Sequence, residues 1–292
     1  MSTVKSLENI QNDSSLATGC EQSPAVVSGN SSSWLGFFQS ALYAVFPNHC
    51  YFCQTRVVQY RHSSDKSHAT LCRSCYDSLP SVDKWAYYAC SRCGESSGLK
   101  ERYKPCDASI ILCANCQKKT PAFDRTIFSW LYSYPLDSLV RAYKSQGETR
   151  LLAPLYEGLE HSLAKVYPKR CELPDYLVCV PQHWTKTIRA KPNCARQLAQ
   201  LIAQRFGIEM LDPVRKTENS SKQKTLSLAR RRANLRNSFS LTEDAHQLAG
   251  THIMLVDDVM TTGATLHTIS KLLKQAGARK VDAVVLARRV KR

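Results

Sequence analysis

The sequence predicts an α/β protein, with a parallel sheet flanked by helices and a small cysteine-rich module before it. Two observations lead to this prediction. Short apolar runs of strand length, at 177–180, 253–256 and 281–287, alternate with stretches of helical periodicity, and this alternation is typical of a parallel sheet. Upstream of them, eight of the 13 cysteines lie in four C-x-x-C pairs, the spacing of metal ligands.

Two segments precede the predicted α/β domain, and the second of them begins with an amphipathic stretch. Residues 1–33 are rich in Ser, Asn and Gln and lack apolar periodicity, so we expect them to be disordered. An amphipathic stretch follows at 34–46; we expect it to pack on its own domain, although a membrane surface or a partner would also suit it. The cysteine-rich module occupies 34–120, and the α/β domain is predicted over 121–292.

The paired cysteines form two similar halves. In each half, 18 or 19 residues separate two C-x-x-C pairs, as in zinc ribbons and treble clefs. The predicted metal ligands are Cys50, Cys53, Cys72 and Cys75 in one half, and Cys90, Cys93, Cys113 and Cys116 in the other. Two structural zinc sites are the simplest interpretation, since four thiolates leave no position for water. Interleaved pairs, a single filled site, a redox dithiol and ligation by His49 or Cys106 stay open.

After Cys116 the composition becomes that of an ordinary globular domain. We expect strands at 123–134, 177–180, 253–256 and 281–287, and helices at 136–146, 151–166, 193–206 and 266–275. Gly147, Gly207 and Gly277 follow three of these helices, where a helix C-terminus favours glycine. An open parallel sheet of this kind binds its ligands at the carboxyl ends of its strands.

One stretch, Ile253–Thr265 (IMLVDDVMTTGAT), carries the chemistry. An apolar strand runs into two carboxylates, then into a Thr/Gly turn at a helix start. The unpaired N–H groups and dipole of a helix start suit a phosphate, and Gly263 lets the backbone approach it. The carboxylates would repel phosphate, but they suit vicinal hydroxyls or Mg²⁺ held through water. A ribose carrying a 5′-phosphate fits both halves.

This stretch resembles the phosphoribosyl-pyrophosphate (PRPP) binding motif of type I phosphoribosyltransferases. The resemblance implies that the acidic pair contacts the ribose hydroxyls and that the turn contacts the 5′-phosphate. The predicted PRPP-binding residues are Asp257, Asp258, Val259, Met260, Thr261, Thr262, Gly263, Ala264 and Thr265. The expected fold is therefore of the type I phosphoribosyltransferase kind.

Positive charge is concentrated before this motif. The chain has a net charge of +16, and residues 213–239 hold eight Lys or Arg against one Glu. A further five basic residues and no acidic residue lie in 181–205. Such clustering favours a polyanion, either a pyrophosphate group or a nucleic-acid backbone. A diphosphate needs fewer cations, so the number favours the longer ligand.

Together, these features resemble the ComF/GntX family of competence-type phosphoribosyltransferase-like proteins. Similar motifs are Tyr143-Lys144, Val180-Pro181-Gln182-His183, and Gln223, Leu226, Arg231, Asn234 and Phe239 at the family's spacing. The predicted pyrophosphate- or DNA-binding residues are Lys144, Asn193, Gln223, Arg230, Arg231, Arg232, Asn234 and Arg236. One departure stands out: Ala190-Lys191-Pro192-Asn193-Cys194 replaces the family's Arg-Gly-Phe-Asn-Gln, in the region that wraps the pyrophosphate, which bears on catalysis more than on binding.

The resemblance implies a cytoplasmic accessory protein of DNA uptake and natural transformation. It would bind single-stranded DNA and a PRPP-type ligand with Mg²⁺, and would meet DNA-uptake or recombination proteins. The alternative is an active phosphoribosyltransferase of nucleotide metabolism; enzymatic turnover stays open because no nucleophile, general acid or general base stands out. Residues 1–33 lack a secretion signal and no apolar run reaches membrane-spanning length, so we expect no stable membrane insertion.

Overall fold

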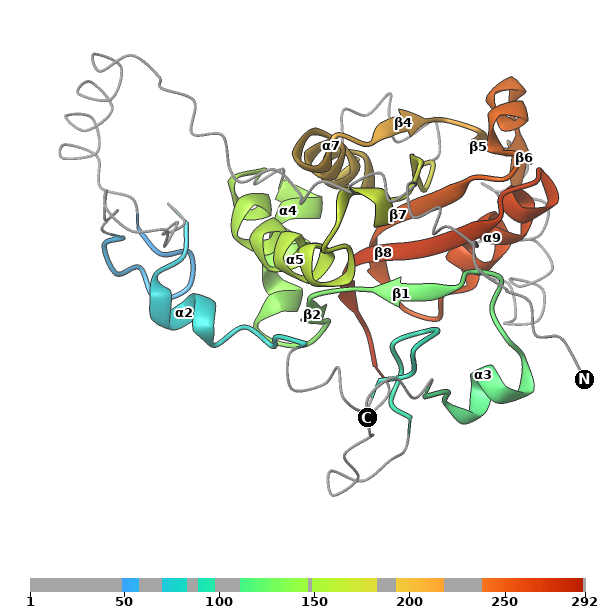
Figure 1. Cartoon of the computed structure of the whole chain (residues 1–292). Coiled ribbons are helices and arrows are strands. Elements are labelled where there is room, and N and C mark those ends of the chain that lie inside the picture. Colours follow the sequence, from blue (N-terminus) through green and yellow to red (C-terminus); the bar gives the residue numbers. More distant parts are fainter. Residues whose placement is uncertain are drawn as a thin grey trace, which may run out of the picture.

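The structure is a computed structural model that describes residues 49–57, 70–82, 89–97, 111–146, 149–182, 193–217 and 238–290 (Figure 1). The predictions for 1–33 and 34–46 lie outside the described residues, as does Cys106. The same is true of six predicted pyrophosphate- or DNA-binding residues, Gln223, Arg230, Arg231, Arg232, Asn234 and Arg236. Among the described helices, none has the length and apolar character needed to cross a membrane.

A parallel sheet forms the centre of the α/β domain. Its strands are β1 (Arg125–Ile127), β2 (Trp130–Leu131), β3 (Tyr176–Cys179), β4 (Glu209–Leu211), β7 (His252–Met260) and β8 (Lys280–Arg288). Their order is β1-β8-β7-β3-β4, with β2 pairing the same strand β8 as β1 does. Each of these pairings is parallel. The fold is that of a type I phosphoribosyltransferase domain, as predicted.

Helices cover both faces of this sheet (Figure 1). They are α4 (Leu136–Gln146), α5 (Leu152–Val166), α7 (Cys194–Phe206) and α9 (Ala264–Gln275), with 3₁₀ turns at Thr149–Leu151, Arg170–Glu172 and Glu243–Leu248. Met254 and Val256 of β7 pack with α4, α5 and α7, while Ile253 and Leu255 pack with α9. All four are fully buried, which confirms a strand covered on both faces.

Strand β7 is longer than the sequence predicts. The apolar run 253–256 was expected to end at a turn, but the strand spans nine residues and includes the acidic pair. The cause lies in its neighbours. Pairing with β3 ends at Val256, whereas pairing with β8 continues to Met260 opposite Arg288. The carboxylates therefore lie on a strand end that is paired on one side only.

The strand predicted at 123–134 is split into β1 and β2. Between them, the carbonyl of Ser129 accepts a hydrogen bond of 2.9 Å from the amide of Val82. Ser81 also forms a bridge with Trp130. The cysteine-rich module thus forms hydrogen bonds with backbone groups that would pair within the sheet if the strand were continuous.

A separate antiparallel hairpin brackets the basic stretch. It consists of β5 (Val214–Lys216) and β6 (Phe239–Leu241), with Lys216 opposite Phe239. The amide of Thr217 donates to the carbonyl of Ser238 at 2.9 Å. The hairpin therefore brings together Thr217 and Ser238, the residues on either side of 218–237.

The two cysteine halves repeat one local structure. In each, a tight knuckle carries the first C-x-x-C pair, and the amide of its first cysteine donates to the carbonyl five residues later, at 2.9 Å from Cys50 to Thr55 and 2.7 Å from Cys90 to Glu95. A short helix carries the second pair: α2 (Arg73–Asp77) and α3 (Ala114–Lys118). The repetition supports two equivalent parts of the cysteine-rich module. We call them the first module, which contains Cys50 to Cys75, and the second module, which contains Cys90 to Cys116.

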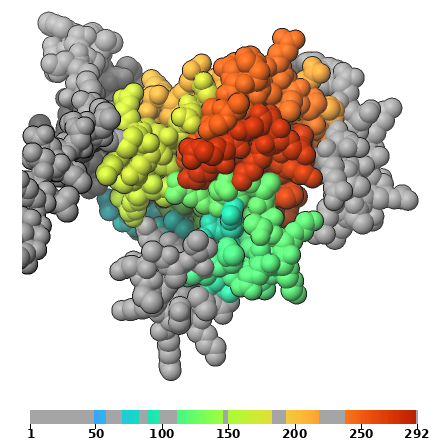
Figure 2. Space-filling view, turned by 45° about the vertical axis from the view of Figure 1, so that its right-hand side comes forward, coloured from blue at the N-terminus to red at the C-terminus, as the bar shows by residue number. Residues whose placement is uncertain are grey.

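Both modules pack on the α/β domain. In the first, Leu71 and Leu79 belong to the same core as α4 and α5, and the ring of Tyr76 meets Trp130 edge-on at 5.7 Å. The second module lies against the C-terminal elements (Figure 2). A domain boundary near residue 120 stays a prediction.

Candidate functional site

The two carboxylates of the predicted binding motif lie where β3 and β7 part. The amide of Val180 donates to the carbonyl of Val256 at 2.9 Å, and the chain of β3 leaves the sheet after that point. Helix α7, which follows β3, covers one face, and α9, which follows β7, covers the other (Figure 1). This divergence is the position at which an open α/β sheet forms a ligand crevice.

Lys144, in the last turn of α4, lies at this end of β7. Its Nζ lies 2.7 Å from Oδ2 of Asp258, and both side chains are partly exposed. The other carboxylate oxygen, Oδ1, accepts from the amide of Val259 at 2.6 Å. Asp258 is therefore held in a fixed orientation beside a cation, and the ion pair places two of the predicted site residues together.

Asp257 has a different environment. Its Oδ1 accepts from the amide of Asp258 at 2.8 Å. Burial, followed by the charge of Asp258, raises the pKa of Asp257 to about 7. Asp257 is thus partly protonated near neutral pH, so this carboxyl group can both donate and accept hydrogen bonds.

The loop after the strand is shaped for close approach to an anion. Gly263 has φ of 72°, and it caps α9, whose first amide, that of Ala264, donates to Oγ1 of Thr262 at 3.3 Å. Thr261 and Thr262 are exposed. The start of α9 thus lies beside two exposed threonines, and amides in the first turn of a helix lack acceptors within the helix, which suits a phosphate.

The start of α7 contributes a further predicted site residue, Asn193. Asn193 is the N-cap of this helix, and its Oδ1 accepts from the amide of Arg196 at 3.0 Å. Tyr143 of α4 donates to Oε1 of Gln197. Burial, followed by the charge of Asp258, raises the pKa of the Cys194 thiol. Capping engages Oδ1 of Asn193, whereas an anion would accept from its Nδ2 group, so the predicted contact with pyrophosphate stays a prediction.

The raised pKa of Asp257 predicts a measurable effect on stability. The unfolded chain ionises this group near pH 3.8 and the folded chain near pH 7, so the folded state loses stability as the pH rises between these values. Asp257→Asn should therefore be more stable than the wild type at pH 8, by about 1–3 kcal/mol. The gain should shrink progressively below pH 7. Urea unfolding across pH 5–8 measures it.

Asp258→Asn is the matched control for this prediction. It removes the partner of Lys144 and also the charge that helps to raise the pKa of Asp257, so any gain in stability at pH 8 should be smaller than that of Asp257→Asn. A gain for Asp257→Asn that does not change with pH, or an equal gain for both variants, would contradict the assignment.

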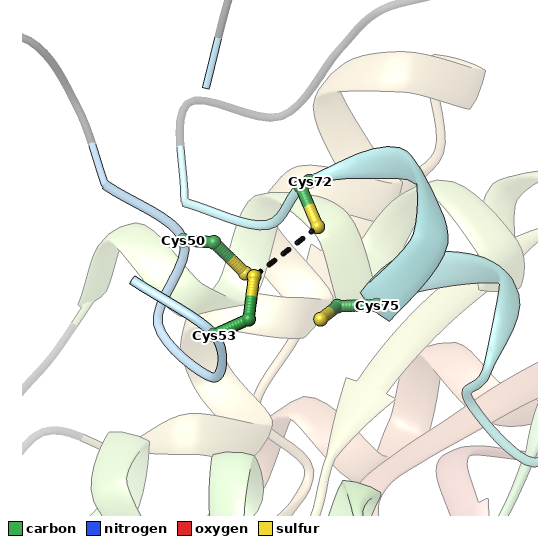
Figure 3. A group of neighbouring side chains, drawn as sticks. All are labelled: Cys50, Cys53, Cys72 and Cys75. Carbon is green, nitrogen blue, oxygen red and sulfur yellow. Dashed lines mark hydrogen bonds between the residues drawn. The ribbon is translucent and has the colours of Figure 1, made fainter. Parts of the chain in front are cut away.

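Each cysteine group brings four thiols together within 4.8 Å of one another. Figure 3 shows the first group, in which Cys53 and Cys72 lie 3.6 Å apart between their sulfurs. In the second, the sulfurs of Cys93 and Cys113 are 3.7 Å apart. A tetrahedron of sulfurs at about 2.3 Å from zinc requires spacings of about 3.8 Å. The residues present therefore fit a structural metal ion.

The pairing follows the simplest prediction. The first two C-x-x-C pairs form one group and the last two the other, so the pairs do not interleave, and neither group found in the described part of the chain includes His49. All eight predicted ligands are thus in the two expected sets.

Two buried charged residues of β8 were not predicted. Arg288 ends β8 with its side chain 4% exposed, and it donates to the carbonyl of Met260 at 3.2 Å and to that of Thr261. Asp282 is fully buried within the same strand. A lone carboxylate inside the apolar run 281–287 was a signal for Asp282, whereas nothing in the sequence marks Arg288 as buried.

The chain is similar to proteins of known families over about 60% of its length. A family model for the phosphoribosyl transferase domain matches residues 192–292. Competence protein F of Haemophilus influenzae is 32% identical over 180 residues, covering 60% of this chain and 78% of that protein. DNA utilization protein YhgH of Escherichia coli K12 is 29% identical over 191 residues, covering 63% and 81%.

A shorter match falls on a metabolic enzyme. Adenine phosphoribosyltransferase of Mycobacterium marinum is 41% identical over 49 residues, covering 17% of this chain and 27% of that enzyme. The extent of the match to competence protein F decides the family, and it agrees with the parallel sheet and the acidic pair at its carboxyl end. The chain belongs to the competence protein F (ComF) family of phosphoribosyltransferase-domain proteins.

Proposed function

We propose that this protein acts in the cytoplasm in the uptake or utilization of DNA, binding single-stranded DNA and a PRPP-type ligand. The names of two relatives, a competence protein and a DNA utilization protein, support the biological role. DNA-uptake or recombination proteins are its expected partners. The ligand assignments below rest on the chemistry of the site.

The observation that carries the ligand proposal is the acidic pair beside the Gly263 loop. Ribose hydroxyls would donate to Asp257 and Asp258, which lie at the end of β7. The 5′-phosphate would accept from Thr261, Thr262 and the first amides of α9. Mg²⁺, when bound, would neutralise the pyrophosphate group. Lys144, paired with Asp258, would supply a positive charge for that group.

The basic stretch supports the DNA proposal. Residues 213–239 carry eight basic residues and one acidic residue, and the β5–β6 hairpin joins the ends of this stretch. A single strand of DNA offers a run of phosphates that such a density of charge can neutralise. Zinc in the two four-cysteine groups would have a structural role, because each group offers four sulfurs and no open position.

The test is binding of a fluorescent single-stranded oligonucleotide to the metal-loaded protein across a salt series, with and without PRPP and Mg²⁺. We expect a steep fall of affinity with salt. Replacing Arg230, Arg231 and Arg232 with Gln should flatten the log–log slope by about 2, since each phosphate contact on a single strand adds about 0.7. Thermal stabilisation by PRPP should disappear in Asp257→Ala/Asp258→Ala, with DNA affinity nearly unchanged.

The matched control for charge is the triple change Lys118→Gln, Lys119→Gln and Lys169→Gln. These three lysines are exposed in the structure and lie outside the basic stretch, so the same loss of charge should leave the slope nearly unchanged. Equal slopes for the two triple variants would place the DNA surface elsewhere. Unchanged PRPP stabilisation in the aspartate variant would remove the ligand assignment.

An active phosphoribosyltransferase of nucleotide metabolism is the second candidate. The same acidic pair and loop favour it, together with the short match to adenine phosphoribosyltransferase. Clear PRPP binding without any binding of single-stranded DNA would favour this enzyme.

A further inference from the structure

Arg288 connects the phosphate loop to the second cysteine group. Its side chain is 4% exposed and is paired with Glu95, Nη2 to Oε2, at 3.2 Å. Its Nε donates to the carbonyl of Cys93 at 2.8 Å. Its Nη1 donates to the carbonyls of Met260 and Thr261. One buried guanidinium thus bonds a metal-ligating knuckle on one side and the start of the loop on the other.

The position of the Cys93 carbonyl depends on the knuckle that contains it. Cys93 is one of four thiols grouped for a metal ion, and Glu95 closes the same knuckle by accepting from the amide of Cys90 at 2.7 Å. A bound metal would fix the two cysteines of the knuckle relative to each other. It would thereby fix the carbonyl of Cys93 and the backbone of Glu95, whose carboxylate pairs with Arg288.

On the other side, Arg288 fixes the backbone that leads into the phosphate loop. The carbonyls of Met260 and Thr261 lie three and two residues before Gly263, whose φ is 72°. Orienting these peptide groups orients the amides that follow them. A shift of the guanidinium would therefore change the direction of the donors that a phosphate requires.

A second contact runs in parallel. Thr126 donates from Oγ1 to the carbonyl of Arg92 at 2.7 Å, and the same hydroxyl lies 3.9 Å from Sδ of Met260. The Met260 side chain in turn lies beneath Gly263, where an added Cβ would come within 2.4 Å of its terminal carbon. The carbonyls of Arg92 and Cys93, which are adjacent in the knuckle, thus accept hydrogen bonds from Thr126 and Arg288. Both of these residues in turn contact Met260.

We propose that Arg288 is a positioning residue that couples metal binding at the second cysteine group to phosphate binding at Thr261–Thr265. The proposal rests on the proposed ribose-phosphate site. Because coupling between two binding sites is reciprocal, each ligand raises the affinity of the protein for the other by the same factor. The first cysteine group, which packs on the core of α4 and α5, takes no part.

The test uses the full chain loaded with zinc. Ribose 5-phosphate is the probe, because the pyrophosphate of PRPP itself chelates zinc. Zinc affinities are measured by competition with a colorimetric chelator, with and without the probe. We expect ribose 5-phosphate to raise the affinity for one of two zinc ions by about tenfold and leave the other unchanged. Protein lacking that ion should bind ribose 5-phosphate about tenfold more weakly.

Three variants assign the effect. Arg288→Lys keeps the charge but cannot span both sets of acceptors, so the coupling factor should fall below about twofold. Arg279→Lys makes the same exchange at an exposed position and should keep the full factor. Cys53→Ser disables the first cysteine group at its exposed ligand, and coupling should persist in it.

Glu95→Gln keeps the test decisive if Arg288→Lys does not fold. It preserves the shape of the side chain and removes the ion pair, so the coupling factor should fall to about threefold or less. If ribose 5-phosphate binds but changes neither zinc affinity, or changes both equally, the coupling is absent and the phosphate site stands. If ribose 5-phosphate produces no thermal shift, both proposals fail. If Arg288 had only a structural role, replacing it would lower the melting temperature of the protein and leave the coupling factor intact.

Discussion

Replacing Cys116 with Ser is expected to unfold the second cysteine module. The only apolar cluster in this module, within the described residues, consists of Cys90, Cys113 and Cys116, with Cys93 and Leu112 packed against it. The ligands are therefore the core. The described part of the module has no other apolar cluster of its own, and metal binding in comparable small modules supplies roughly 10–16 kcal/mol of folding free energy.

The first module should lose less of its structure when one of its predicted metal ligands is replaced. Cys50, Leu71 and Leu79 belong to the large core around α4 and α5, so Cys75→Ser should lose its metal but keep part of its docked structure. Metal content by mass spectrometry and hydrogen exchange over 89–97 and 111–120 would measure the difference.

Cys179→Ala is the matched control, because this buried cysteine lies on β3, away from both groups. It should retain both metal ions. Full protection from exchange over 89–97 and 111–120 in Cys116→Ser would contradict a metal-dependent core.

Asp282→Ala should destabilise the α/β domain by about 3–5 kcal/mol. Asp282 is fully buried in β8, and its Oδ2 accepts from Nε of Arg125 at 2.9 Å, from the hydroxyl of Tyr167 at 2.7 Å and from Nε2 of His252 at 2.8 Å. Nζ of Lys280 lies 3.4 Å from the same atom. Removing the carboxylate leaves these donors without an acceptor at the centre of the sheet.

The same network predicts the pH dependence. Hydrogen bonding from His252 and the charge of Arg125 outweigh burial and lower the pKa of Asp282 to about 2. A carboxyl whose pKa is lowered in the folded state stabilises the protein above its unfolded pKa near 3.8, and this contribution is lost as the pH falls toward 2. The difference between wild type and Asp282→Ala should therefore be largest above pH 4.

Guanidinium unfolding at pH 7 and pH 3 measures both effects. Tyr167→Phe, which removes one donor, should cost about 1 kcal/mol. Asp77→Ala breaks an ion pair with Arg73 in which both side chains are more than half exposed, and it should cost under about 1 kcal/mol. A cost for Asp282→Ala as small as that of Asp77→Ala would show that the network does not stabilise the fold.

Long periodic elements were predictable from the sequence, and short ones were not. The helices at 136–146 and 193–206 and the strands around 253–256 and 281–287 are found within a few residues of their predicted bounds. Strands β4, β5 and β6 have three residues each, too few for a period. The split between β1 and β2 depends on a hydrogen bond to Val82, which local sequence does not encode.

The residues of the candidate site also differ in how well the sequence alone predicts them. The acidic pair and the Thr/Gly loop follow each other in the chain, so their chemistry could be predicted together. The contact between Lys144 and Asp258 joins α4 to β7, and only the family resemblance pointed to that lysine. Arg288 shows as a basic residue at a strand end, and its burial results from contacts with Cys93 and Glu95, nearly two hundred positions earlier.

The position of β8 in the sheet has a consequence for the order of folding. This strand pairs with β1 and β2 on one side and with β7 on the other, and Arg125 lies opposite Asp282 although 157 positions separate them. During synthesis, β1 therefore has no partner until the ribosome has passed Arg288, and contacts of such long range form slowly. The cysteine modules can acquire metal early, but the surface that receives the second module exists only after β8 has been made.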